Sequence, residues 1–367
     1  AYRLSRRLGP TPARARSEAM VATALAIMGR RDESRRHADE GMRIAREVGQ
    51  LDVLIFCSQM RGMASCFLGD FDRGLSRLSE TSSRYSRWLE VGELCFYGQT
   101  AHAIESVRGE PTHAVPLLRV ATARARRLNA PPPAAHVAEL CLRAHEAVAQ
   151  GAAPALPARE DLRGFPRTAA WGPVTRRFLE SDELGAEFEA HVALFAQGKQ
   201  SARTAHPILF EHYVSVAYAR LRQTILAPDR RAPLARLKKA VADVLASARF
   251  PLYRAHALVL EGAVRWLSGD LDKARARLAE ADVLADQEKC VWARFQAERI
   301  RAHMLRDEAH RASAEQRARI ALTIARDAKA LSWERLICEE LEISASRSSS
   351  ARRSSVVTSQ ASHRRQL

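Results

Sequence analysis

The residues that could carry chemistry in this sequence are few and far apart. Histidines come closest to one another as His206 with His212 and as His303 with His310. His303 and His310 could share one helical face, as two imidazole ligands of a metal ion do, but no carboxylate or cysteine stands at the spacing of a third ligand. We therefore expect surface or core histidines here and no metal site.

Acidic and thiol side chains give no better start for catalysis. Glu180, Asp182 and Glu183 resemble a general acid–base group only in composition, and a solvated helix face or helix N-terminus explains them more simply. Cys66 and Cys95 have no evident His partner, which favours a packing role. Nucleotide loops of the forms G-x-x-x-x-G-K-[ST] and G-x-G-x-x-G after a strand are absent, as is H-E-x-x-H. We expect no catalytic residue, no cofactor and no enzymatic activity in this region.

The composition is typical of a folded, helical chain. Of the 367 residues, 47% are hydrophobic and 27% charged, and an aromatic share of only 6% favours helix over sheet. The longest mainly apolar stretches, such as residues 20–28, are much shorter than a membrane span, so we expect no membrane contact. The six cysteines contain no C-x-x-C pair, which indicates a reducing, cytoplasmic setting without zinc or disulfides.

The formal charge of +16 raises the question of an acidic partner. Most arginines are interleaved with carboxylates, as Arg30, Arg31 and Arg43 are with Glu33 and Glu40, and this pattern is typical of a solvated helix face. We favour that interpretation. A helical-repeat module that binds nucleic acid through its basic surface is the alternative.

A turn signal recurs every 40 residues along much of the chain. Gly29, Gly69 and Gly109 are 40 residues apart, Gly269 follows after four further periods, and one more period reaches Ala309. Glycine ends a helix where φ must be positive, and the Asp or Glu that soon follows each of these glycines favours the N-terminus of the next helix. The pattern predicts antiparallel helical hairpins.

Each 40-residue unit has room for two helices. We expect helices at about 53–67 and 71–88, at 93–108 and 112–128, and later at 175–197, 204–226, 232–249 and 252–268. Gly62 and Gly262 lie seven residues before their turn glycines and allow the first helix to approach the second. A stripe of small residues and leucines recurs after the turns and suits close packing of hairpins, with members Ala114, Ala274, Ala314, Leu78, Leu118, Leu278, Ala121, Ala281 and Ala321.

With these marks, residues 14–128 and 252–343 resemble the tetratricopeptide repeat. The units depart from the family pattern in having 40 residues rather than about 34 and in lacking most of its aromatic and Pro positions. Such long units resemble sensor or scaffold regions of large bacterial signal-transduction ATPases and Ser/Thr kinase–ATPase regulators. The resemblance implies an all-α fold, an α-α superhelix (solenoid) of antiparallel hairpins.

The chain divides into four parts on this interpretation. Residues 1–150 form an N-terminal helical lobe, 151–174 a Pro/Gly-rich insertion, 175–343 a C-terminal helical lobe and 344–367 a disordered Ser/Arg-rich tail. In the tail, two arginines precede Ser354 and Ser355, an arrangement that basophilic kinases recognise, so we predict phosphorylation there. The chain begins without Met and on what resembles the end of a helix, so we expect a longer parent protein.

The first helices of stacked hairpins line a concave wall, which is the usual site for a protein or peptide ligand. A Phe on a helix is more often core than contact, so a core position is the alternative for the aromatic members. We predict a non-catalytic protein-binding scaffold or sensor region of a larger cytoplasmic signalling protein, with a kinase or ATPase domain upstream. The resemblance places on the wall Phe56, Gln59, Met63, Phe67, Phe96, Gln99, Ala103, Gln296, Arg299, His303 and Arg306.

Overall fold

The computed structural model describes residues 9–129, 133–151, 165–198 and 201–342, and within these ranges every regular element is a helix. The predicted all-α class is therefore confirmed. The first half contains α2 (Pro12–Ile27), α3 (Arg31–Val48), α4 (Leu51–Phe67), α5 (Phe71–Tyr85), η1 (Ser86–Trp88), α6 (Val91–Arg108), α7 (Ala114–Ala125) and α8 (Pro133–Gln150). The second half contains α9 (Phe165–Ser181), α10 (Ala186–Gln197), η3 (Ala202–Thr204), η4 (Pro207–Leu209), α11 (Phe210–Leu226), α12 (Arg231–Ser247), α13 (Pro251–Leu267), α14 (Leu271–Gln287), α15 (Val291–Asp307), α16 (Arg311–Asp327) and α17 (Leu331–Leu341).

Left-handed residues join the helices into hairpins at the predicted 40-residue interval. The φ angle is 76° at Gly29, 87° at Gly69, 84° at Gly109 and 85° at Gly269. Ala309, one period after Gly269, adopts a φ of 63° although it carries a Cβ. The turn prediction is confirmed at all five positions.

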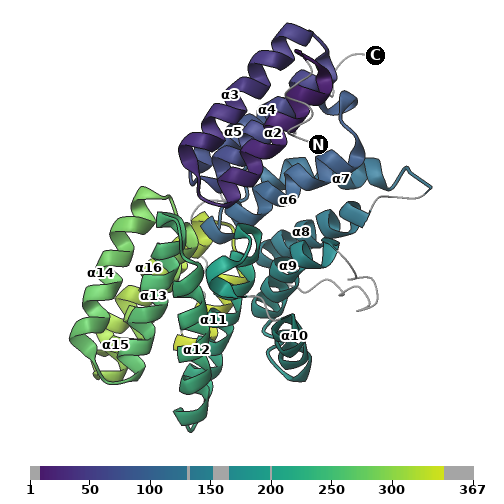
Figure 1. Cartoon of the computed structure of the whole chain (residues 1–367). Helices are drawn as coiled ribbons and strands as arrows, with labels where there is room; N and C mark the ends of the chain where they lie inside the picture. Colours follow the sequence, from purple (N-terminus) through teal and green to yellow (C-terminus); the bar gives the residue numbers. More distant parts are fainter. Residues whose placement is uncertain (1–8, 130–132, 152–164, 199–200, 343–367) are drawn as a thin grey trace, which may run out of the picture.

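Small residues set the distance between the two helices of a hairpin. A Cβ added to Gly62 would lie 3.1 Å from the side chain of Leu78, and one added to Gly262 would lie 3.0 Å from Leu278. Both leucines are fully buried. The hairpins in turn stack through their first helices, each on the next (Figure 1). One series is α2, α4, α6 and α8, and the other is α11, α13, α15 and α17.

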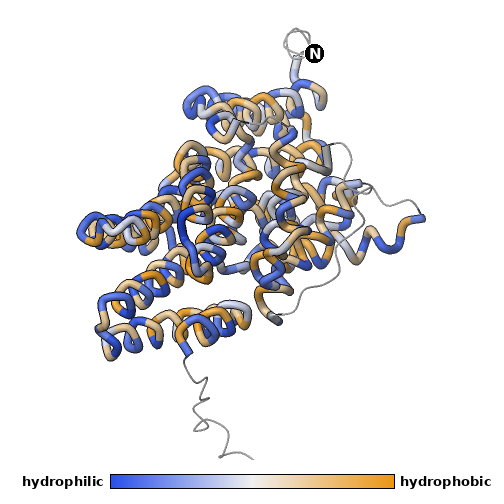
Figure 2. The backbone as a smooth tube through the Cα atoms, turned by 90° about the horizontal axis from the view of Figure 1, so that it is seen from below, coloured by the Kyte–Doolittle hydropathy of each residue, from blue (hydrophilic) through white to orange (hydrophobic). Residues whose placement is uncertain are grey.

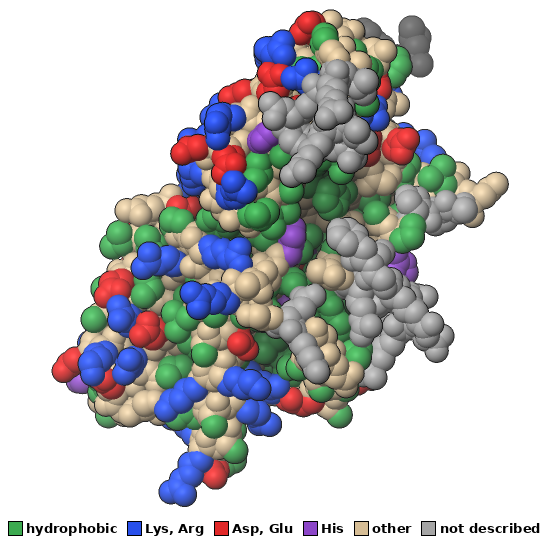
Figure 3. Space-filling model, viewed as in Figure 1, with side chains coloured by type: hydrophobic (Ala, Val, Ile, Leu, Met, Phe, Trp, Pro, Cys, Tyr) green, Lys and Arg blue, Asp and Glu red, His purple; other side chains and the backbone are tan. Residues whose placement is uncertain are grey.

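The outer faces of the hairpins are polar and their charges are largely paired. Hydrophilic and hydrophobic turns alternate along the tube of each helix (Figure 2). Arg43 contacts Glu40 and Glu47, and Arg30 contacts Glu33, so the solvated-face interpretation holds for these arginines. Blue and red side chains are accordingly interleaved over much of the visible surface (Figure 3). In the described ranges, no helix has both the length and the apolar character that a bilayer span requires.

The middle of the chain differs from the prediction. Helix α9 begins at Phe165 and contains Pro166, Gly172 and Pro173, so the predicted insertion 151–174 is helical in its last part. The single helix predicted at 175–197 is two helices, because the chain turns at Asp182 with a φ of 61°. A proline normally ends a helix, but burial of α9 between α8 and α11 overrides that local preference. Residues 152–164, like the tail 344–367 with Ser354 and Ser355, lie outside the described residues.

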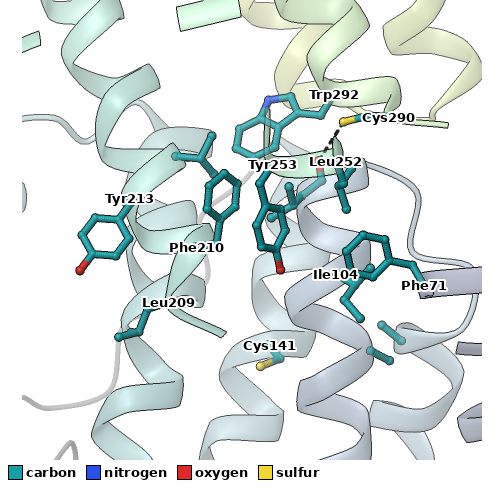
Figure 4. Packing of buried hydrophobic residues seen from close by; sticks show 14 of the residues in the cluster. Phe71, Ile104, Cys141, Leu209, Phe210, Tyr213, Leu252, Tyr253, Cys290 and Trp292 are labelled. Atoms are coloured by element: carbon teal, nitrogen blue, oxygen red, sulfur yellow. Dashed lines mark hydrogen bonds between the residues drawn. The ribbon is translucent and has the colours of Figure 1, made fainter. Parts of the chain in front are cut away.

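The two halves of the chain pack against each other through aromatic side chains. Within the second half, Phe210 of α11 stacks on Tyr253 of α13 with ring centroids 3.9 Å apart (Figure 4), and Phe71 of α5 in the first half lies 6.1 Å from the same Tyr253 ring. Phe71 of α5 meets Phe250 edge-on at 5.8 Å, which joins the first half to the second. Helix α6 also contacts α11 and α15, and α8 contacts α17. The inner side of the first stack is therefore covered, in part, by the second half of the chain.

A buried histidine connects the same two halves through its hydrogen bonds. His256 of α13 donates from Nε2 to the carbonyl oxygen of Val107 at 2.9 Å, and its Nδ1 accepts from the hydroxyl of Tyr218 at 2.9 Å. Burial lowers the pKa of His256 to about 3, so the ring is neutral at physiological pH. A neutral ring has one donor and one acceptor nitrogen, and both are used.

At Gly109 the end of α6 touches the second half so closely that only glycine fits. A Cβ there would lie 2.7 Å from the ring of Trp333 and 2.9 Å from the Cβ of Trp292. Gly269 occupies the equivalent turn in the second half, between α13 and α14, and has the same left-handed φ. A Cβ added to it meets nothing within 4 Å. The two glycines thus separate the cost of backbone strain from the cost of a clash.

We predict that Gly109→Ala destabilises the chain more than Gly269→Ala does. The strained φ alone costs about 1–2 kcal/mol, and the clash with two tryptophans at Gly109 adds roughly 1–3 kcal/mol. Urea unfolding of both variants and the parent measures the difference. Equal losses in the free energy of unfolding would show that Gly109 does not contact the second half as described.

Candidate functional site

Five of the predicted wall residues are buried within the first half, namely Gln59, Met63, Phe67, Gln99 and Ala103. Gln59 donates to Ser82 Oγ at 2.7 Å inside its own hairpin, whereas Gln99 donates to the carbonyl oxygen of Ala134 at 2.8 Å in the neighbouring hairpin. Met63 is fully buried. The two glutamines share the 40-residue period but not a role. These five side chains are not accessible to a partner in this structure, so the wall prediction is corrected for them.

The two predicted phenylalanines are half-buried. Phe56 lies beneath the guanidinium of Arg16, which is 5.5 Å from the centre of its ring, and Phe96 packs against the core from its edge. Their positions leave part of each ring open to solvent. Contact of Phe56 and Phe96 with a partner stays a prediction.

Three of the four predicted polar residues of α15 come together on a carboxylate that the sequence did not single out. The fourth, Gln296, is buried and accepts from Arg299 Nη1 at 2.8 Å, so the wall prediction is corrected for it too. Arg299 donates from Nε and Nη2 to the two oxygens of Glu340 at 2.6 Å each, and His303 Nε2 lies 2.9 Å from Glu340 Oε2. Arg306 donates to the backbone carbonyl of Glu340 at 2.6 Å. Arg299 and His303 are buried, which corrects their predicted role as ligand contacts. Arg306 is exposed, so its contact with a partner stays a prediction.

Glu340 is held as a carboxylate inside the protein. Burial opposes its charge, but Arg299 and His303 more than compensate and keep its pKa below the usual range. Arg222 of α11 adds a contact at 3.3 Å from Nη1 to Glu340 Oε1. The Glu340 cluster therefore links α11, α15 and α17, and its function is structural.

The other groups considered for catalysis are also satisfied internally. In the described residues, no group of three His, Cys, Asp or Glu side chains is placed to hold a metal ion. His303 is buried and His310 is exposed, so this pair does not form a site. The carboxylates Glu180, Asp182 and Glu183 pair separately with Arg176, Arg222 and Arg177.

A cluster of titratable side chains that the sequence analysis missed lies where the halves meet. His102 of α6 is 2.9 Å from His145 of α8, measured from Nδ1 to Nε2, and its Nε2 is 2.9 Å from Oε2 of Glu211 in α11. All three side chains are buried. Helix α9 approaches the cluster at Gly172, where an added Cβ would lie 2.5 Å from Glu211 Oε2.

The protonation of this cluster follows from its contacts. Burial opposes charge on His102, but neighbouring Cys141 and Glu211 raise its pKa to about 10. Burial also raises the pKa of the Cys141 thiol. Burial lowers the pKa of His145 well below its usual value. A charged His102 then donates both of its N–H groups, to Glu211 and to neutral His145.

A small pocket lies beside this cluster, between α6, α8, α9, α11 and the turn from α16 to α17. Its inner end is formed by buried side chains that include His102, Arg176 and Glu211, and its rim includes half-buried Pro111 and exposed Lys329. Arg176 lies flat over the ring of Trp292, with Cζ 3.4 Å from the ring centre, and pairs with Glu180. We call this space, lined by both halves, the central pocket.

The central pocket contains buried polar atoms without a partner. Ser106 Oγ, Arg176 Nη1 and Glu211 Oε1 make no hydrogen bond to the described residues. They come from α6, α9 and α11 and all line the pocket. Unpaired buried polar groups cost roughly 1–3 kcal/mol each, so a group that binds in the pocket and satisfies them gains that energy. The geometry supports binding of a small molecule and supplies no activated nucleophile.

The sequence does contain one signal for the His102 cluster, namely the titratable residues of helices α6 and α11. In α6 and α11 almost every position is buried, and yet these helices carry His102, Glu105, Glu211 and Arg222. Titratable residues on a helix buried all round need partners, so their presence indicates a polar cluster. The identity of the partners could not be inferred, because His102 and Glu211 are 109 residues apart.

Comparison with protein-family models, with curated proteins and with solved structures finds no match to this chain.

We predict that Glu340→Gln lowers the free energy of unfolding by about 3–5 kcal/mol, because it leaves the buried Arg299 guanidinium without a counter-charge. The neighbouring Glu339 is a matched control, since its half-exposed side chain meets Arg335 and also Arg222, which keeps Asp182 and Glu340 as further partners. Glu339→Gln should cost less than about 1 kcal/mol. Chemical denaturation measures both, and similar small losses would contradict the buried ion pair.

Proposed function

We propose that this chain is a non-catalytic, tetratricopeptide-like region that binds another protein. The stacked hairpins, their left-handed turns at a 40-residue interval and the buried Ala and Leu stripe support the resemblance on which this proposal rests. Helical hairpins of this kind present long surfaces for recognition. A partner protein needs a surface of the hairpins that the rest of the chain does not occupy.

The observation that carries the proposal is an apolar face of α2, at the end of the first stack, which the other described residues leave exposed. Helix α2 packs on α3 and α4 through one side. Its opposite side presents Ser17, Met20, Val21, Ala24 and Met28, at the spacing of a single helical face and without a charge. Met20 is 58% exposed and Met28 65% exposed. We call this surface the α2 face.

Two physical features suit the α2 face to a protein partner. A helix at the surface of a soluble protein normally exposes polar side chains to solvent, whereas the exposed α2 face is apolar like the buried side of the same helix. Methionine side chains are flexible and polarisable, so they adapt to the shape of an apolar partner. Burial of Met20 and Met28 in an interface would remove this exposed apolar area from water.

We further propose that the region belongs to a larger cytoplasmic regulatory protein of bacterial signalling, such as a Ser/Thr kinase or a signal-transduction ATPase. This context rests on the resemblance of the long repeat units. Five of the six cysteines are buried as free thiols, which is compatible with a reducing compartment.

The alternative function, binding of nucleic acid, is favoured by one specific surface. Arg231, Arg236, Lys238 and Lys239 of α12 are exposed and form no ion pair with the described residues, unlike most arginines of α3. Figure 3 shows the blue side chains gathered over this part of the molecule. An unpaired basic helix face can neutralise phosphates.

One capture experiment distinguishes the two functions. The tagged chain, its Met20→Glu variant, a Lys238→Glu/Lys239→Glu variant and a Val283→Glu control are incubated with extract of the native cells, with and without nuclease. Val283 is a suitable control because it is 57% exposed on α14, away from the α2 face. We expect proteins that survive nuclease and are lost only with Met20→Glu.

Two outcomes would contradict the protein-binding proposal. A set of captured proteins that is identical for Met20→Glu and Val283→Glu would exclude the α2 face. Capture that disappears with nuclease and with the double lysine variant would favour the nucleic-acid function instead.

A further inference from the structure

The central pocket is lined by residues of neither α2 nor α3 and is separate from the α2 face. Its inner side chains are fixed by other contacts: Arg176 by Trp292 and Glu180, and Glu211 by His102. Both are nine-tenths or more buried. Each nevertheless keeps one polar atom, Nη1 of Arg176 and Oε1 of Glu211, without a hydrogen bond to the described residues. The pocket thus offers a preorganised cationic donor and an anionic acceptor.

The charges around the pocket are already balanced. Glu211 is paired with charged His102, and Arg176 is paired with Glu180. Glu105, which also lines the pocket, is paired with His113. Lys329 lies at the exposed rim, where water solvates its charge. A ligand with a net charge would leave one charge uncompensated in a buried site, which is costly. A ligand without net charge that carries one acceptor and one donor avoids this cost.

Size restricts the ligand further. The enclosed space holds only a few water-sized molecules, so a drug-sized ligand or a peptide does not fit. The hydroxyl of Ser106, also unpaired, supplies a third polar contact from α6. The rim at Pro111 and Lys329 provides the way in from solvent.

From these features we propose that the central pocket binds a small zwitterion, an α-amino acid of the size of glycine or alanine. Its carboxylate accepts from Arg176 Nη1, its ammonium group donates to Glu211 Oε1, and the Ser106 hydroxyl contacts either group. Charge-assisted hydrogen bonds of this kind are the strong ones in proteins. The ligand replaces the waters that would otherwise satisfy these three atoms.

Binding in this pocket would also tighten the contact between the halves of the chain. Ser106 and His145 belong to the first stack, whereas Glu211 and the α16–α17 turn belong to the second half. A ligand that contacts α6, α9 and α11 together binds the closed arrangement better than an open one, and so it raises the thermal stability of the whole chain.

The test uses isothermal calorimetry and thermal unfolding of the intact chain with glycine and alanine. Acetate and methylammonium, which each carry one half of the zwitterion, serve as ligand controls, and leucine serves as a size control. We expect saturable one-to-one binding and a raised melting temperature with glycine or alanine only. Ser106→Ala and Glu211→Gln should each weaken binding about tenfold or more, because each removes a hydrogen-bond partner of the ligand.

Ser247→Ala is the matched protein control, since Ser247 is buried in α12 and its hydroxyl donates to the carbonyl oxygen of Val244 within that helix. It should bind like the parent. Absence of saturable binding to the folded parent chain would mean that the pocket holds water only and would overturn the proposal. Undiminished binding in folded Ser106→Ala and Glu211→Gln would place the ligand elsewhere and would overturn it equally.

Discussion

The structure depends on one close approach, at the end of α6, between the two halves of the chain. Gly109 reaches Trp292 and Trp333 there, and two residues earlier the carbonyl of Val107 accepts from His256. A glycine with positive φ permits the approach, and a neutral histidine satisfies the backbone group that the approach buries. The aromatic packing and the buried polar clusters lie on either side of this contact.

Helix α11 is the element around which these contacts are organised. Nearly all of its residues are buried. From it, Glu211 reaches His102 of α6, Tyr218 reaches His256 of α13 and Arg222 reaches Glu340 of α17. Because each of these buried polar groups requires its particular partner, they favour one arrangement of the hairpins over alternatives that apolar contacts alone would allow. In this respect the chain differs from a simple array in which each hairpin contacts only its neighbours.

Local structure could be predicted from the sequence to the extent that it depends on local signals. The turn glycines and the buried Ala and Leu stripe are encoded within one unit, and the structure confirms them. The interior of helix α9 could not be foreseen, because Gly172 and Pro173 argue against a helix locally and packing against α8 and α11 overrides them.

The partners of the buried polar residues could not be predicted from local sequence signals. Arg299 and His303 were predicted on an accessible wall, but they are buried on Glu340, a carboxylate that lies 41 residues from Arg299 on another helix. In the same way, nothing near His102 indicates Glu211. A repeat pattern describes how neighbouring hairpins stack, whereas the function of a polar residue here depends on the other half of the chain.

The most direct measurement of this closed arrangement is a zero-length carbodiimide cross-link between the halves, mapped by mass spectrometry. The exposed ammonium of Lys289 lies 3.0 Å from the carboxylate of Asp72, although 217 residues separate them. Lys273 and Asp270, 2.9 Å apart within one half, provide the internal control. The closed arrangement predicts that both links form. Formation of the Lys273–Asp270 link without any link between Lys289 and Asp72 would show that the halves do not pack together as described.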